Sequence, residues 1–172
     1  MTETLNAVPF RRAVLGLNGG PTDSLVVRLG CDLARGHKAE LVAIHVVEVD
    51  WSHELSEEIA SGSEAASAVL DTAEALAEKW GYRLEPELLQ ARDVGAALVD
   101  EAASLEADLI ILGLHFRKKF GGDFAIGRTV PYVFQNAPCG VLVAREPIAT
   151  SDARGDDQQV ATGAGLGAAD RV

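Results

Sequence analysis

Residues 107–145 place two short apolar runs on either side of a basic, glycine-containing loop. The first run, residues 109–112, is unbroken and stops at Gly113, which is typical of a strand covered on both faces by helices. A helix is expected to open near Gly127, and a second apolar strand covers residues 141–144. The loop therefore lies at the carboxyl edge of a parallel sheet, where ligands bind in open α/β folds.

This loop carries positive charge on an otherwise acidic chain. The sequence has 26 acidic and 15 basic residues and a formal net charge of −11, yet Arg117, Lys118, Lys119 and Arg128 fall in this short stretch. Basic side chains next to the free N–H groups at the start of a helix favour an anion. The alternative is that residues 117–119 form a solvated basic loop, as charge runs usually do.

The residues before this stretch supply three more strands and three more helices. Apolar runs predict strands at 13–17, 41–49 and 84–90. Helical spacing predicts a first helix that Thr22 or Asp23 can cap, a second over 53–80 that is continuous or broken around Gly62, and a third over 94–105. Capping preferences predict that Gly36 ends the first helix in the left-handed conformation, that Gly81 ends the second, and that Asp93 opens the third.

Strands and helices therefore alternate, and crossovers between parallel strands are right-handed. The predicted fold class is α/β, a doubly wound, Rossmann-like parallel sheet of five strands in the order 3-2-1-4-5, with helices on both faces. The third strand contains Pro86, which cannot donate to a neighbouring strand and so belongs at a sheet edge. That position agrees with the predicted order.

The chain is long enough for one domain with a sizeable core, because 48% of its 172 residues are hydrophobic. We divide it into an N-terminal extension (1–10), one folded domain (11–146) and a tail (147–172). The tail is small and polar without periodicity, so we expect it to be disordered. Deleting residues 151–172 should then change Tm by no more than about a degree or two.

Composition also argues against several functions. The acidic surface repels nucleic acid and anionic membranes. No apolar run reaches the length of about 18 residues that a membrane helix needs, and the N-terminus lacks a cleavage pattern, so we expect a cytoplasmic protein that is not inserted in a membrane. Cys31 and Cys139 lie in apolar segments and are interpreted as small hydrophobic residues. Four scattered histidines, among them a core-type His45 and an isolated His115, predict no metal site and no catalytic residue.

The motifs ADLIILG (107–113), GRTVPYV (127–133) and NAPCGVLVAR (136–145) resemble the universal stress protein family. The resemblance covers about residues 11–145. Members of the family often carry G-x-x-G, nine residues, and G-[ST] around the phosphates of ATP. Gly113 and Gly127 stand at the first and last glycines, whereas Phe116 replaces the second glycine, the spacer has one extra residue and Arg128 replaces the Ser/Thr.

The resemblance implies that ATP or another adenine nucleotide binds at the carboxyl edge of the sheet. The implied nucleotide-binding residues are Gly16, Leu17, Asn18, Val46, Gly113, Gly127, Arg128, Thr129 and Val130. Asn18 stands where the family has an aspartate that holds the ribose or adenine, but an asparagine before two glycines is also an ordinary turn residue. Arg128 either pairs with phosphate, or blocks the site or faces a partner.

The function expected from these residues is a cytoplasmic stress-response module that binds a nucleotide. The alternative is a nucleotide-independent interaction protein of the same fold, and residues 127–139 look like versions of the domain that work with membrane transporters. The family resemblance implies at most weak ATP hydrolysis, and no catalytic residue is assigned. An apolar last strand (Val141, Leu142 and Val143) at the sheet edge predicts a homodimer through that strand.

Overall fold

The structure is a computed structural model that describes residues 10–51, 60–114 and 126–147. Strands and helices alternate throughout the described part, as predicted. In chain order the elements are β1 (Arg12–Leu17), α1 (Asp23–Arg35), β2 (Glu40–Glu48), α2 (Ala60–Lys79), β3 (Glu85–Ala91), α3 (Val94–Ser104), β4 (Leu109–Gly113), α4 (Thr129–Asn136) and β5 (Gly140–Ala144).

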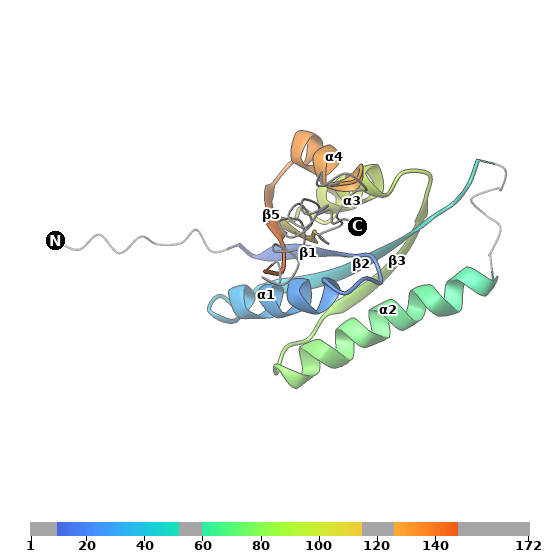
Figure 1. Cartoon of the computed structure of the whole chain (residues 1–172). Helices are drawn as coiled ribbons and strands as arrows, with labels where there is room; N and C mark the ends of the chain where they lie inside the picture. The colour runs from blue at the N-terminus through green and yellow to red at the C-terminus, as the bar shows by residue number, and fades with distance from the viewer. Residues whose placement is uncertain (1–9, 52–59, 115–125, 148–172) are drawn as a thin grey trace, which may run out of the picture.

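The strands form one five-stranded sheet in the order β3-β2-β1-β4-β5, and every neighbouring pair is parallel. The predicted fold class and strand order are therefore confirmed. Helices α1 and α2 cover one face of the sheet, and α3 and α4 cover the other (Figure 1). The strand β1 lies in the centre, with Leu15 opposite Ala43 of β2 on one side and Ile111 of β4 on the other.

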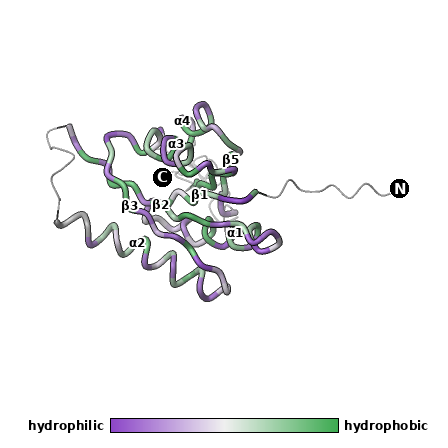
Figure 2. Tube along the Cα trace, turned by 180° about the vertical axis from the view of Figure 1, so that it is seen from behind, coloured by the Kyte–Doolittle hydropathy of each residue, from purple (hydrophilic) through white to green (hydrophobic). Residues whose placement is uncertain are grey.

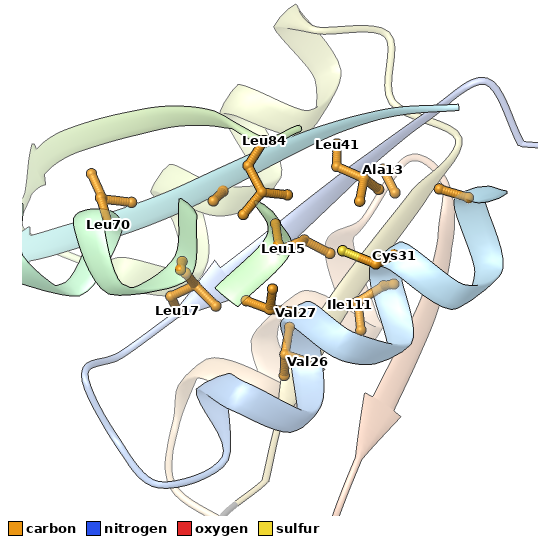
Figure 3. Close-up of a cluster of buried hydrophobic side chains, with 14 of the residues drawn as sticks. Ala13, Leu15, Leu17, Val26, Val27, Cys31, Leu41, Leu70, Leu84 and Ile111 are labelled. Atoms are coloured by element: carbon orange, nitrogen blue, oxygen red, sulfur yellow. The ribbon is translucent and has the colours of Figure 1, made fainter. Parts of the chain in front are cut away.

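The core consists of two apolar layers, one on each face of the sheet, because successive residues of a strand point to opposite faces. Leu15 and Ile111 pack under α1 with Val27 and Cys31 (Figure 3). The opposite layer includes Ile110 of β4. Burying a side chain of this size contributes about 1.5 to 3 kcal/mol of transfer free energy. Along α2, hydrophobic and hydrophilic residues alternate on the turns of the helix (Figure 2), which matches its half-exposed position.

The edge position of β3 is confirmed by its pairing. It bonds to β2 alone among the described strands, and Pro86 lies opposite Ala43. The structure also confirms the ends predicted for two helices. Asp93 accepts a hydrogen bond from the Ala96 N–H at 2.8 Å, and Gly81 follows α2 with a φ of +69°.

One local prediction about α1 is wrong, and the prediction for its start is confirmed only in part, because Thr22 is the N-cap residue but does not cap with its side chain. Gly36 ends the helix with a φ of −66°, in the right-handed region, and the left-handed conformation falls on Lys38, with a φ of 54°. The N-cap residue Thr22 makes no capping hydrogen bond through its side chain, and the Asp23 carboxylate turns back toward the preceding loop.

Other boundaries differ from the sequence predictions by about one residue at strand ends. The helix α2 is continuous from residue 60 to residue 79, so Gly62 does not break it within that range. No helix in the described ranges is long and apolar enough to span a membrane. The predictions for residues 1–9, for the second-glycine position 116, for His115 and the basic residues 117–119, and for the tail 148–172 lie outside the described residues.

Candidate functional site

A cavity of about 360 Å³ lies at the carboxyl edge of the sheet, between the ends of β1 and β4. The helix that follows β1 covers one face of the sheet and the helix that follows β4 covers the other, so the strand order reverses between these two strands. This is the point at which open α/β sheets leave a crevice. The lining comes from the end of β1 (Gly16, Leu17, Asn18), the end of β4 (Leu112, Gly113, Leu114), α3 (Val94, Leu98) and residues 126–130.

The cavity brings together all of the sequence-predicted site residues except Val46. Residues 16–18 are separated in sequence from residues 113 and 127–130 by more than half of the folded domain. The pairing of β1 with β4 brings the two groups together. Val46 is buried in β2 and lies outside the lining. A volume near 360 Å³ falls in the range of about 300 to 1,000 Å³ that small-molecule sites occupy.

The loop between β1 and α1 is held by its own side chains. The Asn18 side-chain oxygen accepts from the Gly20 N–H at 2.8 Å. The Asp23 carboxylate accepts from the N–H groups of Asn18 at 3.2 Å and Gly19 at 2.8 Å. Gly19 has a φ of +76°, which a side chain would strain. Asn18 is therefore a turn residue in this structure, and its amide nitrogen is the group it can offer to a ligand.

Two neighbouring groups set the electrostatics of this loop. Burial raises the pKa of the Asp23 carboxyl, although the backbone N–H groups of Asn18 and Gly19 and the nearby His45 oppose that shift. His45 Nδ1 lies 2.9 Å from the Leu17 carbonyl oxygen, so the histidine is a hydrogen-bonded part of the sheet, as the sequence predicted. The loop is thus a preformed edge of the cavity.

Two glycines allow the strand ends to approach their neighbours. A Cβ atom added to Gly16 would lie 2.5 Å from Leu112 Cδ2, inside the wall of the cavity. A Cβ atom added to Gly113 would lie 2.5 Å from the Thr22 hydroxyl oxygen. Side chains at these positions would either fill the cavity or move α1.

The start of α4 supplies the polar end of the cavity. Gly127 has a φ of +79°, Arg128 is the N-cap residue, and the helix begins at Thr129. The N–H groups of Thr129 and Val130 belong to the first turn, where they have no partner within the helix. A helix start of this kind favours an anionic group.

The side chain of Arg128 is already paired. Its Nη2 lies 3.1 Å from Glu48 Oε1, and the two side chains are 82% and 51% exposed. Arg128 is the one charged residue among those that line the described cavity. Glu48 was not among the predicted site residues, and its position as the last residue of β2 is the one sequence signal that could have found it.

The apolar wall of the cavity was also missed by sequence reasoning. Val94 and Leu98 lie one turn apart at the start of α3, and Ile126, in the segment before α4, also lines the cavity and is 46% exposed. The sequence placed both α3 residues only within the predicted helix over residues 94–105. Together the wall and the start of α4 can hold a flat apolar group next to an anionic one.

A second cavity, of about 380 Å³, lies between α1 and α2 and includes Val69 in its lining. Its size is comparable, but its lining comes from α1, α2 and the loop between β1 and α1 and includes no residue of β4, so it does not lie between the two strands at which the order reverses. The cavity between β1 and β4 is therefore the candidate site.

The strand order and the position of the cavity define a doubly wound α/β domain with a ligand crevice at its carboxyl edge. The sequence matches the model of the universal stress protein family over residues 9–145, and the chain belongs to that family. No curated protein matches the sequence.

Solved structures of the same family share this fold at low sequence identity. A family member from Burkholderia pseudomallei is 23% identical with a TM-score of 0.60, and the match covers 80% of this chain and 97% of that one. The universal stress protein from Archaeoglobus fulgidus in complex with dAMP is 18% identical with a TM-score of 0.62, over 78% and 98% of the two chains. An Arabidopsis thaliana family protein with AMP bound is 9% identical with a TM-score of 0.57, over 84% and 96%.

Proposed function

We propose that this protein is a regulatory module that binds an adenine nucleotide, with ATP among the candidates, in the cavity between β1 and β4. The observation that carries the proposal is the convergence of glycine backbone, an apolar wall and the start of α4 on one cavity at the strand-order reversal. Family members with dAMP and AMP bound support the same ligand class.

The chemistry of the lining suggests how such a ligand would lie. The adenine ring would pack on the apolar side chains of Val94 and Leu98, and the phosphate would face the N–H groups at the start of α4. Arg128 lies at that same end and adds a positive charge. Asn18 would donate its amide to the sugar.

The first experiment asks whether the protein carries a nucleotide. The protein is purified gently and denatured, and the released small molecules are identified by mass spectrometry. An adenine nucleotide in about equimolar amount supports the proposal. The protein is then freed of ligand and titrated with AMP and ATP by calorimetry.

A matched pair of variants locates the binding site. Val94→Trp fills the proposed cavity, whereas Val69→Trp places the same side chain in the cavity between α1 and α2. Both valines are half-buried on helices, so both variants test the effect of a larger side chain. Loss of AMP binding in Val94→Trp alone supports the proposed site. Loss in Val69→Trp alone would place the ligand in the other cavity.

A second candidate function is a nucleotide-independent interaction module of the same fold. It is favoured by two contacts: the Asn18 side-chain oxygen is used within its own turn, and Arg128 is paired with Glu48. Its partner would be another protein, and membrane transporters are the candidate class because residues 127–139 look like versions of this domain that work with them. Absence of AMP and ATP binding by the native protein, together with their binding by an Arg128→Ser variant, would favour this second function.

We also propose that the protein acts in the cytoplasm as a two-fold homodimer. The strand β5 forms one edge of the described sheet, and Val141, Leu142 and Val143 in it are only half-buried. An apolar strand edge of this kind is commonly covered by another chain.

A further inference from the structure

The ion pair between Arg128 and Glu48 joins the start of α4 to the end of β2, across 80 positions of sequence. Arg128 also lines the cavity, whereas Glu48 does not. Arg128 therefore borders the ligand site while its guanidinium group binds a resident carboxylate. Neither partner is buried, so the pair can open at little cost.

A carboxylate and a phosphate are chemically similar partners for a guanidinium group. Both present oxygen atoms with negative charge, and arginine binds either through its planar N–H fork. A phosphate that reached Arg128 in the cavity would therefore meet a site that Glu48 already occupies. If both anions stayed near the guanidinium, they would repel each other at short range.

The charge of the surroundings strengthens this competition. Arg128 is the one charged residue in the described lining, and Glu48 neutralises it. The chain as a whole carries a formal net charge of −11, which disfavours an approaching phosphate. Besides the N–H groups at the start of α4, a full positive charge for a phosphate at this end of the described cavity is thus available only when Arg128 leaves Glu48.

We infer that Glu48 is a specificity-determining residue, whose carboxylate competes with a ligand phosphate for Arg128. This inference rests on the proposed nucleotide binding and adds a consequence to it. In the native protein Arg128 therefore adds little to the affinity for a phosphate, and AMP is preferred over adenosine less strongly than the site would allow without the charge of Glu48. Removing the charge of Glu48 makes the site selective for the phosphorylated ligand.

The test is a calorimetric titration of the ligand-free protein with adenosine and with AMP. The proteins are the wild type, Glu48→Gln, Arg128→Ala and the double variant. Glu48→Gln should bind AMP about two- to fivefold more tightly, the range expected for releasing an exposed ion pair, and should bind adenosine as the wild type does. The gain should shrink at high ionic strength and in the Arg128→Ala background.

Glu78→Gln is the matched control, because it removes the same charge from an exposed position near the end of α2. This end of α2 lies at the amino edge of the sheet, since the next strand begins there. Glu78→Gln should leave the ratio of adenosine to AMP affinity unchanged. An equal gain in Glu78→Gln would mean that overall charge explains the effect, and would overturn the inference.

The outcomes separate the inference from the function on which it rests. AMP affinity that is unchanged in Glu48→Gln would overturn the competition and leave nucleotide binding in place. Weaker AMP binding in Glu48→Gln would also overturn it, because Glu48 would then position Arg128 for the ligand. A wild-type protein that binds neither adenosine nor AMP would overturn the proposed function, and the inference would fall with it.

Discussion

Gly113 lies against Thr22 so closely that a Cβ atom built on the glycine would be 2.5 Å from the threonine hydroxyl oxygen and 2.9 Å from its Cβ. Thr22 is 1% exposed, and its hydroxyl has no hydrogen-bond partner among the described residues. Because the Thr22 Cβ is fixed to the backbone at the start of α1, the side chain cannot simply rotate away. The end of β4 and the start of α1 can meet only with a glycine at position 113.

Gly113→Ala should therefore destabilise the protein. The added methyl group must push α1 away from β4, and overpacking of this kind costs about 1 to 3 kcal/mol. Urea denaturation measures the loss in the free energy of unfolding. Gly36→Ala is the control, because nothing lies within 4 Å of its added Cβ and its φ is −66°. It should be neutral or stabilising by up to about 1 kcal/mol. Equal losses in the two variants would contradict the close contact.

The Asp23 carboxyl should make stability depend on pH with the opposite sign to an ordinary salt-bridged acid. Burial raises its pKa in the folded state above the ordinary value of 3.8. The folded protein then holds this proton more tightly than the unfolded chain does. The protonated Asp23 therefore adds its full share to the free energy of unfolding below pH 3.8, and this share is lost as pH rises through the folded pKa.

Asp23→Asn tests this sign. The variant keeps a side-chain oxygen that can accept from the N–H groups of Asn18 and Gly19, but it does not titrate. Urea denaturation at several pH values above 3.8 should show a stability that falls less with rising pH in the variant than in the wild type. A wild-type profile that falls no more steeply than that of the variant would contradict the raised pKa.

Arg128→Ala should weaken ATP binding by about 1 kcal/mol, the low end for a charge-assisted contact. The effect is small because the side chain is 82% exposed and must leave Glu48 to reach a ligand. Arg128→Ser should recover part of the loss by restoring a hydroxyl group beside the start of α4. Calorimetry measures both affinities, and ATP binding that is indifferent to Arg128→Ala would place the phosphates elsewhere.

The homodimer prediction is tested by sedimentation velocity at micromolar concentrations. The wild type should sediment as a dimer, and Val141→Lys should shift it toward monomer because a charge on an edge strand opposes pairing. Leu33→Lys is the control, since Leu33 is a 42% exposed residue of α1 on another surface. Circular dichroism checks that both variants fold. A wild type that sediments only as a monomer would end the dimer proposal.

Much of the fold was predictable because its determinants are local. Apolar runs bounded by glycine marked the buried strands, and Pro86 marked the edge strand by removing one backbone donor. Asp93 marked the start of α3, since its side chain bonds an N–H three residues away. Alternation of such elements leaves few right-handed topologies, and the observed order is the one that places Pro86 at the edge.

What the sequence by itself determined is thus the set of elements, their order in the sheet and the strand ends that form the cavity. Only the tertiary structure decided the contacts within the site, because they join residues that are distant in sequence. Arg128 meets Glu48 across 80 positions, and a guanidinium group can pair with any acid that the fold brings near. The apolar residues Val94 and Leu98 line the cavity because α3 packs against α4 and β2, and helical spacing alone does not distinguish a cavity wall from a core.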